Sequence, residues 1–473
     1  MPSANASAAD LRPGRRESAE IGVAPVGEDE FGRLIRAVEP ALTDAPPSLF
    51  LAGVSGGADS MALCLLLDRW CRANGHRFRA LIVDHGLRAE SAAEAARVSG
   101  WLQARGIASD ILRWSAGKPV AGVQAAARAA RFALMTGRAR ELGARGIFLA
   151  HHLEDQAETM VMRLGRDSGP DGLAGIRMRQ MHAEFPVYRP LLGISPQRLR
   201  AHCVTEAQAW IEDPSNRNRK FERVRVRQEA DGRRAAGLDA MVLHRVASVF
   251  SRLRDWSDGT LASFLREAGE LDPRGFVRLD PITLKGLPAA LRRKLLSGLL
   301  QSVGGGGHPP RGESLARLER WVSEGGFSRV TLAGCLVWRT EKDGIWIVRE
   351  TPRGLRPRIV GAGAGLRWDG RFDVIWREDR PAWVHMLTRA GDRRLRRLRP
   401  PAGSALALPE SVRCSLPAVT DLDGRLFAPH FPETWTDAAQ SEDGRLQIEF
   451  RPAVPWVADA FRASRDDRAG AKV

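Results

Sequence analysis

Apolar and polar positions follow two alternating patterns between about residue 48 and residue 150. Short runs of consecutive apolar residues are typical of buried parallel strands, and longer stretches with apolar residues three or four apart are typical of helices. The predicted strands are residues 51–54, 80–83, 109–114 and 147–150. The predicted helices are residues 60–74, 90–105 and 123–142. Strands and helices that alternate at this spacing predict an α/β fold with a doubly wound parallel sheet.

The pattern changes twice in the rest of the chain. Residues 235–323 have mainly helical spacing, residues 331–339 and 344–349 read as a hairpin, and short strands with Gly, Pro and Asp turns follow. A chain of 473 residues is also too long for one ordinary core. We therefore expect a disordered tail (1–30), an α/β catalytic domain (31–228), a mainly helical middle domain (229–350) and a small α+β C-terminal domain (356–460).

The first predicted strand leads into Ser-Gly-Gly-Ala-Asp-Ser at residues 55–60, and a helix follows. A glycine-rich turn at a helix N-terminus presents backbone N–H groups and the positive end of the helix dipole to an anion. Asp59 would be repelled by phosphates, so it indicates either a magnesium ligand or a first-turn acid that stabilises the helix. The absence of a Walker A lysine excludes that type of P-loop. An ordinary βα turn of small residues is the alternative.

Charge favours a polyanionic partner, because the chain carries a net charge of +16. Residues 214–234 contain eight basic and three acidic residues, and residues 389–399 contain six basic and one acidic, so each segment has a net charge of +5. Such runs fit a solvated surface as well as an RNA contact.

The five cysteines are scattered and none forms a Cys-x-x-Cys pair, which argues against a disulfide framework, a zinc site or a catalytic thiol pair. No apolar run approaches the roughly 18 residues that cross a membrane. We therefore expect a cytoplasmic protein that does not enter the membrane.

Four further segments point to one family. They are IVDHGLRAESAAEA (82–95), QAAARAARF (124–132), LAHHLEDQAETMVMRLGRDSGPDGLAG (149–175), and RPLL (189–192) followed by WIEDPSNRNRKFERVRVR (210–227). With the loop at 55–60, they resemble the tRNA(Ile)-lysidine synthetases, which are N-type ATP pyrophosphatases, over about residues 48–228. The resemblance implies an adenine nucleotide alpha hydrolase-like sheet and tRNA-binding middle and C-terminal domains.

The resemblance also implies a reaction, a carbon–nitrogen ligation on a tRNA-Ile with anticodon CAU. ATP, with Mg²⁺, adenylates the 2-position of the first anticodon cytidine and releases pyrophosphate. The ε-amine of free L-lysine then displaces AMP and leaves lysidine. No obligate protein partner is implied.

Particular residues take roles through this resemblance. ATP is expected at Ser55, Gly56, Gly57, Ala58, Asp59 and Ser60. The expected catalytic residues are Asp59, Arg128, His151 and Asp155, with Mg²⁺ held by Asp59 and Asp155. The expected tRNA contacts are all basic: Arg131, Arg217, Arg219, Lys220, Arg225, Arg227, Arg393, Arg394, Arg396 and Arg397.

Several of these positions also have structural explanations. Asp155 could simply be a favourable acid at a helix start. Arg128 and Arg131, three residues apart on one helix face, could form a solvated polar face. Family members commonly carry Asp-Asp where this chain has Glu154–Asp155, which leaves the role of Glu154 open.

Three other functions compete with this one. A tRNA thiolase of the same superfamily would need catalytic cysteines or an iron–sulfur cluster, yet Cys64 and Cys71 have the spacing of core residues on one helix. A small-molecule amidating ligase would have no use for the basic segments. A catalytically inactive RNA-binding protein would not need the intact loop at 55–60.

Overall fold

The computed structural model describes residues 22–115, 122–182, 185–212, 222–306, 308–325, 329–340, 344–351, 355–397, 408–428 and 445–452. The chain divides into two compact units, residues 1–255 and 256–473. The three domains expected from the sequence stay predictions. Of the expected tail, residues 1–21 lie outside the described residues, while residues 28–30 form the first turn of a helix.

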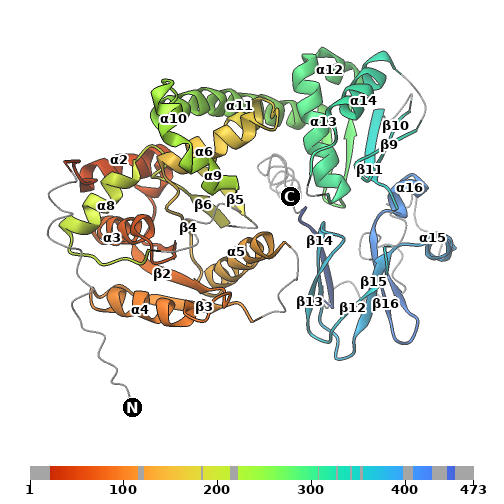
Figure 1. Cartoon of the computed structure of the whole chain (residues 1–473). Helices are drawn as coiled ribbons and strands as arrows, with labels where there is room; N and C mark the ends of the chain where they lie inside the picture. The colour runs from red at the N-terminus through yellow and green to blue at the C-terminus, as the bar shows by residue number, and fades with distance from the viewer. Residues whose placement is uncertain are drawn as a thin grey trace. The chain divides into compact units, whose positions relative to one another are not determined.

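The first unit has a six-stranded sheet at its centre (Figure 1). The strands are β1 (Leu49–Val54), β2 (Arg77–Asp84), β3 (Ser109–Arg113), β4 (Gly146–Phe148), β5 (Arg179–His182) and β6 (Phe185–Tyr188). Their order is β3-β2-β1-β4-β6-β5, and each neighbouring pair is parallel except β5 with β6. The predicted doubly wound parallel sheet is confirmed, with an antiparallel edge strand that was not predicted.

Helices connect the strands of this unit. They are α2 (Glu28–Val38), η2 (Pro40–Leu42), α3 (Ala58–Ala73), α4 (Ser91–Gln103), α5 (Val123–Glu141), α6 (Leu153–Leu164), α7 (Pro170–Leu173), α8 (Pro196–Thr205), α9 (Glu222–Gln228), α10 (Ala230–Ala235) and the start of α11 (Ala240–Ala268). Pro196 lies in the first turn of α8, where its missing N–H leaves no hydrogen bond unmade. The glycine-rich segment 165–175 contains the short helix α7.

Strand β1 is buried along its whole length, which explains its unbroken apolar sequence. Leu51 shares a core with Met135 of α5 on one face of the sheet. Phe50 and Ala52 share a core with α3 and α4 on the other face. Because successive side chains of a strand point to opposite faces, both faces must be apolar. The chain turns from one side of β1 to the other between β3 and β4, so ligands are expected at the carboxyl ends of β1 and β4.

The second unit begins with an antiparallel sheet covered by helices. Its strands are β7 (Gly269–Asp272), β8 (Phe276–Leu279), β9 (Val330–Leu332), β10 (Cys335–Thr340) and β11 (Gly344–Arg349), in the order β7-β8-β11-β10-β9. Its helices are α12 (Pro281–Gly286), α13 (Ala289–Gly304) and α14 (Gly312–Glu324). The hairpin of β10 and β11 was predicted. The β7–β8 hairpin was missed in a region expected to be helical, although Asp272-Pro-Arg-Gly275 is a readable turn, with Gly275 at φ +88°.

Two small sheets complete this unit. Their strands are β12 (Arg358–Val360), β13 (Gly365–Trp368), β14 (Phe372–Trp376), β15 (Ala382–Met386), β16 (Pro417–Asp421), β17 (Leu426–Phe427) and β18 (Leu446–Phe450), with helices α15 (Arg389–Arg396) and α16 (Glu410–Arg413). One sheet has the order β12-β15-β16-β17 and the other β13-β14-β18. Trp368, Trp376 and Val384 belong to the core between them. The expected strand-rich C-terminal region is confirmed, and Asp369-Gly370 lies in the turn between β13 and β14.

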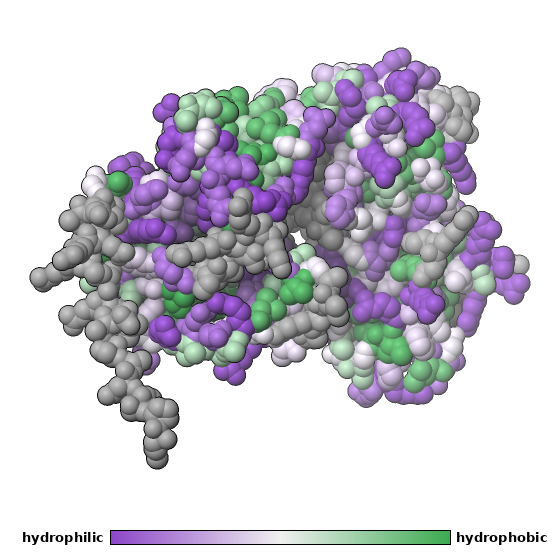
Figure 2. Space-filling model, in the orientation of Figure 1, coloured by the Kyte–Doolittle hydropathy of each residue, from purple (hydrophilic) through white to green (hydrophobic). Residues whose placement is uncertain are grey.

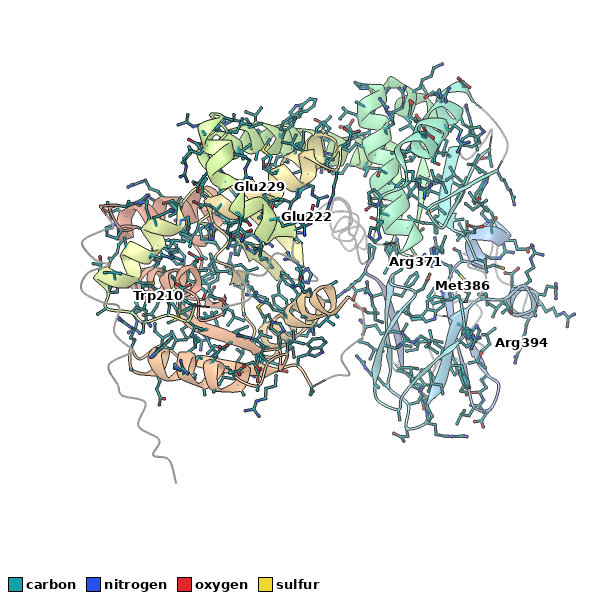
Figure 3. The ribbon with its side chains drawn as sticks, viewed as in Figure 1. Trp210, Glu222, Glu229, Arg371, Met386 and Arg394 are labelled. Carbon is teal, nitrogen blue, oxygen red and sulfur yellow. The ribbon has the colours of Figure 1, made fainter. Side chains whose placement is uncertain are left out.

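A buried ion network ties the two parts of this second unit together. Asp369 Oδ1 lies 2.8 Å from Arg349 Nη2, and Asp369 Oδ2 lies 2.9 Å from Arg371 Nε. Figure 3 labels Arg371, whose side chain is fully buried. Loss of Asp369 would leave two buried guanidinium groups without their carboxylate, so this network holds β11 to the β13–β14 turn.

No helix in the described part of the chain combines the length and the apolar character that crossing a membrane requires.

Candidate active site

The loop between β1 and α3 has the form of an anion cradle. Gly56 has φ +88°, and a Cβ at this position would lie 2.7 Å from Val98 Cγ2, so only glycine fits. Ser60 Oγ donates to the Gly57 carbonyl at 2.9 Å and accepts from the Ser55 N–H at 3.2 Å. Gly57, the N-cap of α3, provides no side-chain cap. The first N–H groups of α3 therefore have no side-chain cap and suit a phosphate.

Asp59 and Asp155 meet at one atom beside this loop. His152 Nε2 lies 3.5 Å from Asp59 Oδ2 and 3.5 Å from Asp155 Oδ2, and His152 Nδ1 lies 3.6 Å from Glu154 Oε2. Asp155 also stabilises the start of α6, because its Oδ2 accepts the backbone N–H of the N-cap residue His152 at 3.1 Å. Asp155 thus has the structural role of an acid at a helix start, and its catalytic role stays a prediction. The sequence prediction named His151 as the catalytic histidine, but His152 makes these contacts.

The two neighbouring histidines have opposite electrostatic environments. Burial disfavours the charged form of His152, but Asp59, Glu154 and Asp155 outweigh it and raise the pKa of His152 to about 10. For His151, burial is the largest effect, and with the nearby arginine charges it lowers the pKa well below 6.5. Burial would raise the pKa of Asp155, yet the charges of both histidines and Arg223 lower it. At neutral pH the site holds a cationic His152 and a neutral His151.

This difference predicts how stability depends on pH. The pKa of His152 is about 10 in the folded chain and about 6.5 in an unfolded one. Charged His152 therefore stabilises the fold fully below pH ~6.5, and this contribution is lost as the pH rises through about 10. We expect the wild type to melt above His152→Gln at pH 6, with the gap in Tm shrinking steadily towards pH 10. A gap that does not depend on pH would contradict the prediction.

A third carboxylate on α6, Glu158, was not recognised in the sequence. Glu158 is 2% exposed, and its Oε1 and Oε2 lie 2.7 Å from Arg227 Nε and 3.0 Å from Arg223 Nε. Burial, the largest effect, raises the pKa of Glu158. A readable signal existed, because Glu158 follows Asp155 by three residues and so lies on the same helix face.

Helix α5 brings two arginines to the same edge of the sheet. Arg128 Cζ lies 5.7 Å from the centre of the Phe132 ring, and burial, followed by the charge of Arg223, lowers the pKa of Arg128. Arg131 Nη2 would lie 3.3 Å from a Cβ at Gly53, so its guanidinium rests against the end of β1. Arg131, expected to contact tRNA, is thus half-buried beside the loop.

The other expected tRNA contacts are distributed differently. Arg225 is exposed on α9, whereas Arg227 pairs with Glu158 in the site. Arg393, Arg394 and Arg397 are exposed in the second unit. Residues outside the described ones, wholly or in their side chains, are Arg217, Arg219, Lys220 and Arg396.

The geometry fits a magnesium ion. In the described part of the chain, no group of three or more His, Cys, Asp or Glu side chains has a metal-binding arrangement. Magnesium, however, is commonly held by one or two carboxylates together with substrate phosphates. Asp59 Oδ1 is buried without a hydrogen-bond partner, which leaves a carboxylate oxygen free beside the anion cradle. Asp59 and Asp155 would be its ligands.

Comparison with known proteins decides the family. Residues 32–231 match the model of the PP-loop domain. A tRNA(Ile)-lysidine synthase of Ruegeria pomeroyi is 35% identical over 339 residues, 72% of this chain and 79% of that protein. One from a Bradyrhizobium strain is 36% identical over 362 residues, 70% of this chain and 99% of that protein. The chain belongs to the tRNA(Ile)-lysidine synthase family.

Family membership agrees with the state of the thiols. Among solved structures, a U34-tRNA thiolase of Methanococcus maripaludis is 16% identical with a TM-score of 0.41 and covers 48% of this chain and 78% of that one. A likeness this weak carries no argument.

The thiols of this member of the lysidine synthase family are mostly buried, and burial raises the pKa of each buried thiol: Cys64, Cys71, Cys203 and Cys335. Thiols in that state are poor nucleophiles, which disfavours thiolation.

Proposed function

We propose that the protein joins free L-lysine to carbon 2 of the first anticodon cytidine of a CAU-anticodon tRNA-Ile, in the cytoplasm and at the expense of ATP. The base is adenylated with release of pyrophosphate, and the ε-amine of lysine then displaces AMP. The observation that supports this most is the meeting of Asp59 and Asp155 at His152 beside the anion cradle. Each carboxylate comes from a different strand end, where nucleotide sites of such sheets lie.

In the adenylation half, the loop at 55–60 and the α3 N-terminus would hold the departing pyrophosphate. Magnesium on Asp59 and Asp155 would supply positive charge to the phosphates. Arg128 is exposed in part, and the charge of nearby Asp155 acts to raise its pKa. It is placed to stabilise charge that develops on the α-phosphate.

In the second half, the ε-ammonium of lysine must lose a proton before it attacks. The pKa values of Asp155 and His151 are both lowered, so neither side chain is a strong base in the site. His151 is neutral, and its buried Nδ1 has no hydrogen-bond partner. On this basis we assign His151 Nδ1 the role of accepting a hydrogen bond from the ε-amine and orienting it for attack.

The test is transfer of labelled lysine to purified CAU-anticodon tRNA-Ile, with ATP and magnesium, while AMP is counted. We expect one AMP for each lysine attached, and no attachment to methionine tRNA with the same anticodon. AMP without attached lysine would mean that another nucleophile is used. No AMP with any tRNA would leave a basic RNA-binding protein.

Helix α15 presents a rigid basic surface. Its N-cap Thr388 accepts the Gly391 N–H at 3.0 Å, and buried Asp392 pairs with Arg413, with Oδ1 at 2.5 Å from Nε. Figure 2 shows hydrophilic residues over this helix, and Figure 3 labels Arg394 on it. The Asp392–Arg413 pair fixes the buried face of α15, and the exposed Arg393, Arg394 and Arg397 can contact phosphates.

Exchange of Arg393, Arg394 and Arg397 for glutamine should weaken tRNA binding. For every phosphate that the variant no longer neutralises, the slope of log affinity against log salt should fall by roughly 0.7 to 0.9. The measurement is tRNA affinity at several salt concentrations, with Arg33 and Arg36 of α2, both exposed, exchanged as the matched control. An unchanged slope would show that α15 is a solvated face only.

A further inference from the structure

Arg189 lies at the carboxyl edge of the sheet, in line with the proposed site. It follows β6 directly, and β6 pairs in parallel with β4, with Phe148 opposite Tyr188. His151 follows β4 by three residues. Because parallel strands end at the same edge, Arg189 and His151 leave neighbouring strands on the same side.

The side chain of Arg189 is buried without a counter-charge. It is 3% exposed; Nη1 donates to the Arg177 carbonyl at 3.0 Å, and Nε is buried without a partner. Burial, and then the charge of Arg128, lowers the pKa of Arg189 to about 10, and no carboxylate opposes these effects. Burying a guanidinium without an anion costs desolvation free energy, and a bound anionic ligand would offset that cost.

The neighbours of Arg189 are cationic or neutral bases. Arg189 and Arg128 both contribute to the lowered pKa values of His151 and His182, although burial is the larger cause for each. Burial lowers the pKa of Arg131 as well, and the charge of Arg128 lowers it further. In the described part of the chain, neither Arg131 nor Arg189 forms an ion pair with a carboxylate.

The carboxylates of the site are already matched on the other side. Asp59 and Asp155 share the cation His152, and Glu158 is shared by Arg223 and Arg227. Asp155 also acts on Arg128 and His151, so the groups left without a carboxylate of their own are Arg131 and Arg189. An oxyanion of the substrate would pair with them.

We propose that Arg189, supported by Arg131, binds the α-carboxylate of the free lysine and so sets which amine the enzyme accepts. This assignment rests on the proposed function. A guanidinium fork matches a carboxylate with two parallel hydrogen bonds. Held at that end, the substrate can extend its ε-amine towards His151 and the activated base.

The burial of Arg189 distinguishes this anion from the other two available. The phosphates of ATP have the loop at 55–60 and the α3 N-terminus. A phosphate of the tRNA backbone is flanked by two riboses, which a 3% exposed side chain cannot accommodate easily. A small carboxylate on a flexible chain is the ligand that fits.

The experiment compares lysine with 1,5-diaminopentane, which is lysine without its carboxylate but with the same reacting amine. The wild type should prefer lysine strongly. Arg189→Gln should lower kcat/KM for lysine about 10- to 100-fold, as expected when the charged partner of the carboxylate is replaced by a neutral donor, and leave kcat/KM for the diamine unchanged. Arg179→Gln, on exposed β5, should change neither value.

The diamine reaction also reports whether the variant is folded. If Arg189→Gln does not fold, Arg189→Lys is the second variant, because it keeps the positive charge but not the two-pronged guanidinium. Its kcat/KM for lysine should fall less than in Arg189→Gln, again with no change for the diamine. Equal losses for both amines, or none, would overturn the carboxylate assignment, and so would a change confined to the KM for tRNA. A wild type that attaches no lysine would instead overturn the proposed function.

Discussion

Asp59→Ala should lower the rate of pyrophosphate release by about 1,000-fold, the scale seen when a key charge-stabilising group is lost. The carboxylate lies in the first turn of α3, and its Oδ1 is buried without a hydrogen-bond partner. Its removal takes away a proposed magnesium ligand and one of the three carboxylates around His152, of which Glu154 and Asp155 remain. The affinity for tRNA should stay within about twofold, because the loop serves the nucleotide.

The comparison for this variant is Asp68→Ala on the same helix. Asp68 pairs with Arg72 one turn further on, at 2.9 Å, and takes no part in the site. Pyrophosphate release should be unchanged in Asp68→Ala at equal Tm. Near-normal turnover of Asp59→Ala would show that the loop at 55–60 does not act in catalysis as proposed.

Asp155→Asn should be almost as damaging, with a loss of about 100- to 1,000-fold in kcat. Asparagine can still accept the His152 N–H, so the start of α6 is kept while the negative charge is lost. The change therefore tests the chemical role of Asp155 apart from its role as a capping residue. The measurement is single-turnover AMP formation with saturating ATP, magnesium and tRNA.

Glu154→Gln is the matched control, because Glu154 is adjacent on α6 and reaches only the other nitrogen of His152. We expect its kcat to stay within about tenfold of the wild type, since Asp59 and Asp155 still hold the imidazole. Equal losses in both variants would mean that kcat depends on the total negative charge around His152 and not on Asp155 as a proposed magnesium ligand. That result would also give Glu154 a function.

The strands and helices of the first unit could be predicted because each is encoded locally. The apolar run of β1 reflects burial on both faces, and the glycines of the loop reflect a turn that only glycine allows at Gly56. The β5–β6 hairpin was missed because two four-residue strands with mixed burial have no distinct pattern. The β7–β8 hairpin was missed although its turn was readable, because the surrounding spacing favoured helix.

Within the candidate site, single positions were easier to find than their partners. Asp59 and Asp155 were named from their motifs, but the sequence did not indicate that the two carboxylates meet at His152. Two adjacent residues after a strand point in different directions, and no pattern in the sequence tells which one faces the ligand. Glu158 was overlooked because one more acid on a helix looks like a solvated residue until its burial is known.

By itself, the sequence determined the α/β class, the anion-binding loop and the family, because each depends on residues close together in the chain. The tertiary structure decided which charges meet. The sheet order places β1, β4 and β6 side by side, and this alone brings the ends that carry Asp59, His152 and Arg189 to one edge. Strand order and burial arise from packing over long separations in sequence, so only the folded chain separates a paired charge from one that awaits a ligand.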